Sequence, residues 1–422
     1  MFTKLQTPEG TRDYLPEEVE QYLQIEQTLR KVFKLWGYEE IRSPTIEFIE
    51  ALSTGVGSEL IDSMFKFQDR NGKILALRAE MTTPVARIVA SRMESKPKPL
   101  RLFYICNVFR YSQPRLESLR EFHQAGVELI GLDKPDAEGE ILALLISAIK
   151  ALGLENVRVD LGHAGLLRAL LNLMHLEESE RTVFKEILNS RNTEKIAKFA
   201  ESKTPPEISR LLTQLLKCKR LEDLRSVNVN SAGTKKFLSE LLEINSVLQD
   251  YGIEKNVFFD FYLIRKIEYY TGVVFEVSIP EFGVPIGGGG RYNNLIEKFN
   301  GSKTPAIGFA VEIEKCLSAL QSRGKALLKK KTPKILVKPK SKRVGIEASK
   351  IFRDKGIICL LNFDRKKFGE TVEHARQCEI DYVVFVGSSI KEKAKVYDLK
   401  SNTAKKLGIE DFLNSLEGAV DE

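Results

Sequence analysis

The stretch Val108-Phe-Arg-Tyr-Ser-Gln-Pro-Arg-Leu-Glu-Ser-Leu-Arg-Glu-Phe-His-Gln-Ala-Gly-Val-Glu-Leu-Ile-Gly131 decides the fold of this chain. It contains the end of one run rich in β-branched and aromatic residues, 99–110, and the whole of a second, 121–130. Such runs predict two strands, and the loop between them contains Pro114. If the strands pair as a hairpin, their neighbouring ends face one site.

The residues before this hairpin alternate between helix and strand patterns. Pro16 opens an amphipathic stretch that Gly37 ends, and residues 40–44 follow as a strand leading into a loop. Residues 64–78 form a second predicted hairpin around Asn71-Gly72, because this dipeptide tolerates the positive φ of a type I′ turn. The sheet is therefore expected to be at least partly antiparallel.

The residues after the hairpin divide into three parts. Leucine-rich spacing predicts helices from about residue 165 to about residue 248. Strand patterns then return at 257–264, 272–278 and 284–286, followed by a helix over 310–320. From residue 334 onward strands and helices alternate, which is typical of a separate small α/β domain.

The composition excludes several classes of protein. With 43% hydrophobic and 29% charged residues the chain is neither disordered nor fibrous. No apolar run approaches the ~18 residues of a membrane span, and no charged-then-apolar leader is seen, so we expect a soluble, cytoplasmic protein. The five cysteines form no C-x-x-C pair and are expected to be reduced and structural, without a metal site.

The net charge of +7 is concentrated in one segment without acidic residues. A flexible linker is the favoured interpretation, because like charges extend a chain, and a nucleic-acid contact is the alternative. The basic residues of this segment are Arg323, Lys325, Lys329, Lys330, Lys331, Lys334, Lys338, Lys340, Lys342 and Arg343.

The glycine run Gly287-Gly-Gly-Gly290 has two interpretations. It could cradle a phosphate, but Arg291 follows where a phosphate loop has Gly-Lys-Ser/Thr. Close packing of the backbone, or close approach of a substrate, is therefore favoured. The four histidines are isolated from one another in the sequence and predict no catalytic triad.

Six motifs in order resemble the class II aminoacyl-tRNA synthetases, in the branch of histidyl-tRNA synthetases and the regulatory subunits of ATP phosphoribosyltransferase. The resemblance covers residues 7 to about 320. Its motifs are Gly10-Thr-Arg-Asp-Tyr-Leu-Pro16, Leu77-Arg-Ala-Glu-Met-Thr-Thr-Pro-Val-Ala-Arg87, the hairpin above, Ile264-Arg-Lys-Ile-Glu-Tyr-Tyr-Thr-Gly272, Gly287-Gly-Gly-Gly-Arg-Tyr292 and Pro305-Ala-Ile-Gly-Phe-Ala310.

The resemblance implies an α+β fold: a class II synthetase-like antiparallel sheet with a helical insertion, plus a small C-terminal α/β domain. The synthetase-like domain is expected over 1–322, with the insertion at about 165–250. A basic linker over 323–333 then leads to the small domain, 334–418, which resembles a shortened anticodon-binding domain.

The resemblance also implies a histidine pocket, in which a carboxylate meets the ammonium group and polar partners meet the imidazole. The alternative for Glu80 and Arg265 is a merely structural ion pair. The residues that match the family's histidine site are Glu80, Thr82, Arg110, Gln124, Arg265, Tyr269 and Tyr270.

The matching ATP positions are degenerate. Ser112 replaces the glutamate that reads adenine in the family, and Ser118 replaces an arginine of the loop. The tetrad Glu312-Ile-Glu-Lys315 stands where the family has Gly-x-Glu-Arg, so Lys315 replaces the arginine and Glu312 the glycine. Because each lost charge-assisted bond costs about 1.5 to 3 kcal/mol, efficient adenylation is not expected, and we predict no catalytic residue and no cofactor.

The favoured hypothesis is a non-catalytic regulatory subunit that binds L-histidine and mediates feedback control through a short-form catalytic subunit of ATP phosphoribosyltransferase. The segments 160–171 and 294–299 resemble the regulatory branch. The resemblance implies a homodimer within a hetero-oligomer, with Pro44 at the interface, and no membrane partner. One alternative is a divergent histidyl-tRNA synthetase, which would bind tRNA. Another is a histidine or uncharged-tRNA sensor outside biosynthesis.

Overall fold

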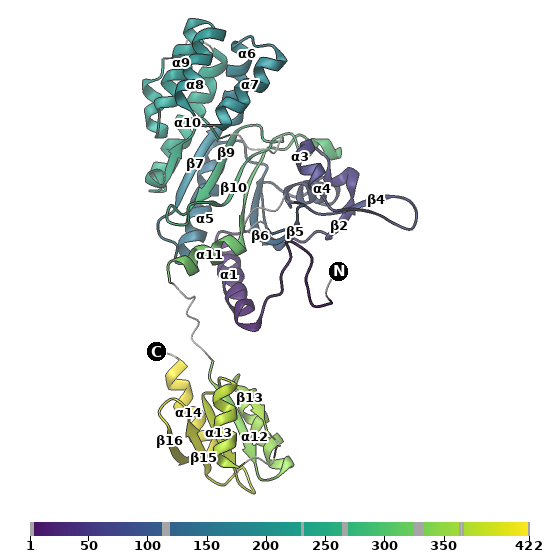
Figure 1. Ribbon diagram of the computed structural model, residues 1–422, viewed down its shortest axis with the longest axis vertical. Coiled ribbons are helices and arrows are strands. Elements are labelled where there is room, and N and C mark those ends of the chain that lie inside the picture. The colour runs from purple at the N-terminus through teal and green to yellow at the C-terminus, as the bar shows by residue number, and fades with distance from the viewer. Residues whose placement is uncertain are drawn as a thin grey trace. The chain divides into compact units, whose positions relative to one another are not determined.

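The computed structural model describes residues 4–111, 119–228, 232–263, 269–324, 332–362, 364 and 367–420. The chain folds into two compact units, Met1–Leu327 and Leu328–Glu422. Figure 1 shows the larger unit as a broad sheet covered by helices, with a helical bundle beyond β7. This is the α+β, class II synthetase-like architecture that the motifs predicted.

An eight-stranded sheet forms the centre of the larger unit. Its outer pairs β1/β5 and β7/β8 are parallel, and its inner pairs are antiparallel. In spatial order the strands are β1 (Glu39–Glu40), β5 (Leu100–Phe109), β6 (Glu121–Ile130), β11 (Ala306–Glu312), β10 (Pro285–Arg291), β9 (Val273–Ser278), β7 (Arg158–His163) and β8 (Val257–Phe259).

The predicted hairpin 99–130 forms the second and third strands of this sheet, β5 and β6. β5 and β6 pair over their full lengths, from Leu100 opposite Ile130 to Phe109 opposite Glu121. Successive side chains of a strand point to opposite faces. One face is therefore apolar, whereas the other carries polar groups such as Gln124 and packs against a separate cluster of side chains.

Three helices cover the apolar face: α1 (Pro16–Leu35), α5 (Pro135–Ala151) and α11 (Ile313–Ser322). In α1, Pro16 occupies the first turn, where its missing N–H costs nothing. The buried side chains of α1 recur every three or four residues, so a single stripe meets the sheet. These side chains are Tyr22, Ile25, Leu29 and Phe33.

A three-stranded sheet in the order β2-β4-β3 stands beside the large sheet. Its strands are β2 (Ile46–Phe48), β3 (Lys66–Gln68) and β4 (Ile74–Leu77), and its helices are α2 (Ile49–Leu52), α3 (Ser58–Asp62) and α4 (Thr82–Arg92). The hairpin predicted around Asn71-Gly72 joins β3 to β4, but its turn differs from type I′. Only Gly72 in the turn has a positive φ, 82°. The Asp69 carboxylate instead accepts the N–H groups of Asn71 and Lys73, each at 2.8 Å, and shapes a longer loop.

A helical segment separates β7 from β8. It comprises α6 (Ala164–Leu173), α7 (Glu178–Asn189), α8 (Thr193–Lys203), α9 (Pro206–Lys217), η1 (Leu221–Ser226) and α10 (Ala232–Asp250), followed by η2 (Glu254–Asn256). Figure 1 shows α6 to α9 as a bundle. The strand predicted over 257–264 ends at Phe259, because Asp260 begins a turn in which its side chain accepts the N–H of Tyr262.

The smaller unit contains one five-stranded sheet in the order β13-β12-β14-β15-β16. Its elements are β12 (Lys334–Pro339), α12 (Lys342–Asp354), β13 (Ile358–Leu361), α13 (Phe368–Gln377), β14 (Tyr382–Val386), β15 (Ala394–Asp398), β16 (Thr403–Leu407) and α14 (Ile409–Val420). β12 begins at Lys334, where the small α/β domain was expected to begin, so the last basic residues of the charged segment belong to β12 and the first turn of α12. Most of the linker expected over 323–333 lies outside the described part, which omits residues 325–331.

Three further expectations concern cysteines, metals and membranes. All five cysteines are free, and four are buried or partly buried, whereas Cys378 is exposed. Among the described residues we find no group of three His, Cys, Asp or Glu side chains that could hold a metal ion. No helix in the described ranges is long and apolar enough to cross a membrane.

Candidate functional site

A cavity of about 670 Å³ opens on the polar face of the large sheet. Its walls come from the start of α4, from β5 and β6, from the segment before β9, and from the glycine-rich strands β10 and β11. Arg265, the remaining residue predicted for the histidine site, lies outside the described residues. The structure brings together in this lining the predicted residues Glu80, Thr82, Arg110, Gln124, Tyr269 and Tyr270.

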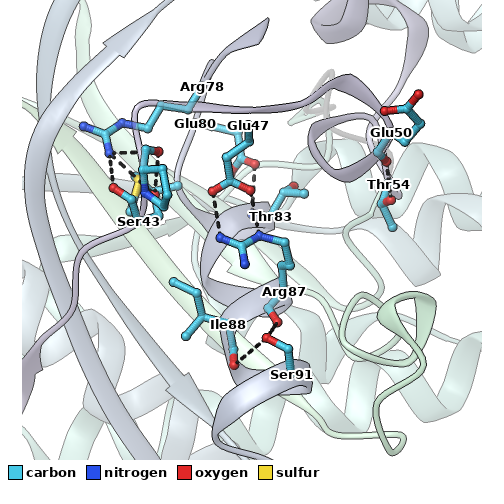
Figure 2. A network of polar contacts seen from close by, with 12 residues as sticks. Ser43, Glu47, Glu50, Thr54, Arg78, Glu80, Thr83, Arg87, Ile88 and Ser91 are labelled. Atoms are coloured by element: carbon cyan, nitrogen blue, oxygen red, sulfur yellow. Dashed lines mark hydrogen bonds and ion pairs between the residues drawn. The ribbon is translucent and has the colours of Figure 1, made fainter. Parts of the chain in front are cut away.

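Glu80 is buried, with 6% of its surface exposed, at the N-terminus of α4. Its Oε2 accepts the N–H of Thr82 at 2.6 Å, and its Oε1 accepts the N–H of Thr83 at 2.9 Å. Figure 2 shows this carboxylate directed at the first turn of the helix. These bonds orient the carboxylate, and a carboxylate has about four acceptor positions, so capacity for a ligand cation is left. Glu80 therefore has a structural role that does not depend on Arg265.

Two arginines fix α4 against the neighbouring strands (Figure 2). Arg87 on α4 makes a bidentate pair with Glu47 on β2, with Nε–Oε2 at 2.6 Å and Nη2–Oε1 at 2.9 Å. Arg78 donates to the carbonyl of Ser43 at 2.9 Å and to Oδ1 of Asn107 at 2.9 Å. Because a bidentate arginine restricts both partners, the wall that carries Glu80 is held rigidly.

Gln124 projects from β6 into the cavity with only 7% of its surface exposed. Its Oε1 is buried and has no hydrogen-bond partner among the described residues. A buried acceptor without a donor costs about 1 to 3 kcal/mol. A ligand that donates an N–H at this position would recover that cost.

Glu128 is a candidate site residue that the sequence analysis missed. It lies four residues after Gln124 on the same face of β6, is 1% exposed, and accepts bonds from Thr82 Oγ1 at 2.9 Å and Tyr292 OH at 2.5 Å. A Cβ on Gly308 would come within 1.9 Å of its Oε2, so only glycine leaves room for it. A charged residue in the apolar run 127–130, in step with Gln124, was the signal that could have identified it.

Burial raises the pKa of Glu128 to about 8. Its hydrogen bonds to Tyr292 and Thr82 lower the pKa, and the negative charge of Glu80 raises it. Glu128 therefore lies directly behind the cavity wall, bonded to the lining residues Thr82 and Tyr292, and its carboxyl group is mostly protonated near neutral pH.

Tyrosine rings form the apolar part of the wall. The ring centroids of Tyr269 and Tyr270 lie 5.0 Å apart, and those of Tyr269 and Tyr292 lie 5.8 Å apart, in edge-on arrangements. Burial raises the pKa of Tyr104, Tyr269 and Tyr292 well above 10, so these hydroxyls stay neutral. The glycine run contributes space: a Cβ on Gly290 would lie 2.7 Å from the Tyr270 ring. Close packing, not a phosphate loop, therefore explains Gly290.

The other end of the cavity contains the degenerate nucleotide positions. The ammonium group of Lys315 lies 2.9 Å from Oε2 of Glu312, and both residues line the cavity. The helix predicted from Ala310 begins only at Ile313, because Ala310 and Glu312 pair with β6 and prolong β11. Ser112 and Ser118 lie outside the described residues.

Arg110 lines the cavity with its guanidinium tied to the protein. Its Nε donates to the carbonyl of Ala79 at 2.7 Å, and the group lies 5.4 Å from the centre of the Phe122 ring. The arrangement presents one cation directly after the end of β5.

The chain is similar to known proteins over most of its length. The family model described as histidyl-tRNA synthetase matches residues 10–316. An ATP phosphoribosyltransferase regulatory subunit of Halothermothrix orenii is 35% identical over 94% of this chain and 96% of that protein. A histidine–tRNA ligase of Thermococcus kodakarensis is 34% identical over 98% of this chain and 99% of that protein. A solved structure from Bacillus halodurans, described as an ATP phosphoribosyltransferase regulatory subunit/histidyl-tRNA synthetase, has a TM-score of 0.79 and 30% identity, covering 92% of this chain and all of that one.

Proposed function

This chain belongs to the histidyl-tRNA synthetase family, and we propose that it is a regulatory subunit of ATP phosphoribosyltransferase without catalytic activity of its own. It binds L-histidine in the cavity beside β6 and passes the occupancy of that cavity to a separate short catalytic subunit. Its role is feedback control of the first step of histidine biosynthesis, in the cytoplasm. Similarity to curated regulatory subunits from several organisms supports this assignment.

The unpaired Oε1 of Gln124 is the observation that carries histidine binding. Histidine has N–H donors at both ends, an ammonium group and an imidazole. Glu80 supplies a buried carboxylate for the ammonium, while Gln124 supplies an acceptor for a ring N–H group. The tyrosines exclude water from the space between them, which strengthens each polar contact.

The pairing of Lys315 with Glu312 supports the absence of adenylation. A lysine that already neutralises a carboxylate 2.9 Å away offers little net charge to a polyphosphate. It also cannot present the planar fork that an arginine offers to two phosphate oxygens. Magnesium ATP would meet the carboxylates of Glu276 and Glu312 in the same cavity lining.

The proposed homodimer is supported by an apolar face on the small sheet β2-β4-β3. The pairing places Phe48, Leu75 and Phe67 opposite one another, so they share one face. Phe48 is 47% exposed and Phe67 is 39% exposed, and Ile46 on the same face is 48% exposed. Contiguous exposed apolar surface of this kind is typical of protein interfaces.

The proposal is tested with purified full-length protein in three assays. Calorimetric titration with L-histidine should give saturable binding that Gln124→Leu weakens about tenfold, because the variant removes the acceptor. Histidine-dependent exchange of labelled pyrophosphate into ATP with Mg²⁺ should be absent. Adding the protein to a short catalytic subunit should make phosphoribosyltransferase activity sensitive to histidine.

A histidine–tRNA ligase is the second candidate, favoured by the similarity to the ligase of Thermococcus kodakarensis over nearly the whole chain. It predicts robust pyrophosphate exchange and transfer of histidine to tRNA. Robust exchange by the purified protein would overturn the regulatory proposal. Binding of histidine without exchange, and without any effect on the catalytic subunit, would instead indicate a sensor outside this pathway.

A further inference from the structure

The first helix of the insertion holds three consecutive carbonyl groups beside the cavity. Arg168 on α6 donates from Nη1 to the carbonyl of Tyr270 at 3.1 Å and from Nη2 to that of Thr271 at 3.1 Å. The N–H of Ala164, the first residue of α6, donates to the carbonyl of Gly272 at 2.9 Å. The segment 270–272 is thus bound to α6 along its whole length.

The same segment is bound on its other side to β10. The N–H of Thr271 donates to the carbonyl of Arg291 at 2.7 Å, and the N–H of Asn293 donates to the Thr271 hydroxyl at 3.0 Å. Tyr270 itself is 7% exposed and lines the cavity. Its backbone therefore lies between the cavity wall and the helical insertion.

The helix that carries Arg168 is firmly joined to β7. The ring of His163 is 1% exposed, and its Nδ1 accepts the N–H of Leu166 at 3.1 Å, which caps α6. Hydrogen bonds therefore link α6 both to β7 and to the segment 270–272. Beyond α6, a cavity of about 440 Å³ lies between Thr271 and α10, so the insertion is not closely packed there.

We propose that Arg168 is a positioning residue of the histidine pocket. The hydrogen bonds from Ala164 and Arg168 to the carbonyls of residues 270–272 couple the binding of histidine to the helical insertion. This inference rests on the proposed function. Binding of a histidine ring against Tyr269 and Tyr270 orders the backbone of these two residues. The three hydrogen bonds from α6 to the carbonyl groups of residues 270–272 extend that order to α6. An arginine is suited to this coupling because its single planar guanidinium group donates hydrogen bonds to two adjacent carbonyl groups.

The test combines a conservative variant with hydrogen exchange in the full-length protein. Arg168→Lys keeps the charge but cannot hold both carbonyls, and Arg168 is solvent-exposed, so folding should be retained. Arg181→Lys is the matched control, because Arg181 also lies in the insertion and its one side-chain hydrogen bond among the described residues goes to the nearby carbonyl of Leu176, at 3.2 Å. We expect Arg168→Lys to weaken histidine binding about tenfold and the control to change it less than about twofold.

The decisive measurement is protection of α6 amides when histidine is saturating. In the native protein and in Arg181→Lys, histidine should slow exchange in α6, whereas in Arg168→Lys the saturated protein should show no added protection there. If native α6 exchanges equally fast with and without bound histidine, or if Arg168→Lys retains both affinity and protection, the inference is wrong while the proposed function stands. A native protein that binds no histidine would overturn both.

Discussion

Replacement of Glu128 by glutamine should remove a pH-dependent loss of stability. Burial raises the pKa of this carboxyl from its ordinary 4.5 to about 8. Between these values the folded protein keeps a proton that the unfolded chain has released. The free energy of unfolding therefore falls as pH rises through this window. Below pH 4.5 Glu128 adds no pH dependence, because it is protonated in both the folded and the unfolded state.

The rise from 4.5 to about 8 sets an upper bound of about 5 kcal/mol on this loss, at about 1.36 kcal/mol for each pH unit. Glutamine has nearly the same shape, and the hydroxyls of Thr82 and Tyr292 can accept from its amide as well as donate to it. Without ligand, Glu128→Gln should match the native protein near pH 5 and be more stable by several kcal/mol near pH 9.

Urea unfolding, monitored by tryptophan fluorescence, measures this difference in the free energy of unfolding. The chain has one tryptophan, Trp36. It packs against the hydrophobic core of the larger unit, and Glu128 belongs to the same unit. Glu121→Gln on the same strand is the control, because that side chain is only partly buried, and it should keep the native pH dependence. Parallel stability curves for native protein and Glu128→Gln from about pH 5 to about pH 9 would refute the reasoning.

Three further predictions concern the packing around the cavity. Glu80→Gln should lower the free energy of unfolding by about 1 kcal/mol, because one of two N–H groups at the start of α4 loses its acceptor, and calorimetry should show weaker histidine binding. Gly308→Ala should lower the melting temperature and reduce histidine binding, because the new Cβ would overlap the Glu128 carboxylate. Arg291→Met should cost about 3 to 5 kcal/mol by urea unfolding, because it leaves Glu138 buried and unpaired. A double variant, Arg291→Met with Glu138→Leu, should recover part of that loss, and no recovery would contradict the pairing.

Much of the fold could be predicted from local patterns. Strand runs and turn residues predicted the central hairpin, because alternation and turn chemistry act over a few residues. Resemblance of the ordered motifs predicted the class II architecture and six of the residues that meet in one cavity, namely Glu80, Thr82, Arg110, Gln124, Tyr269 and Tyr270. Boundaries were less reliable. Ala310 to Glu312 continue β11 because β6 offers hydrogen-bond partners that no local pattern shows.

The chemistry of the site depended on contacts between distant residues. Glu80 and Gln124 were predicted because their motifs resemble those of the family, and each of these motifs is contiguous in the chain. Glu128 became a candidate only when β6 paired with β11, because that pairing places Gly308 beside its carboxylate. The hydrogen bond from Arg168 to the carbonyl of Tyr270 likewise joins residues about a hundred positions apart. The burial of a group depends on all of its neighbours in space, and its pKa and its unpaired atoms follow from that burial. Only the tertiary structure determines those neighbours.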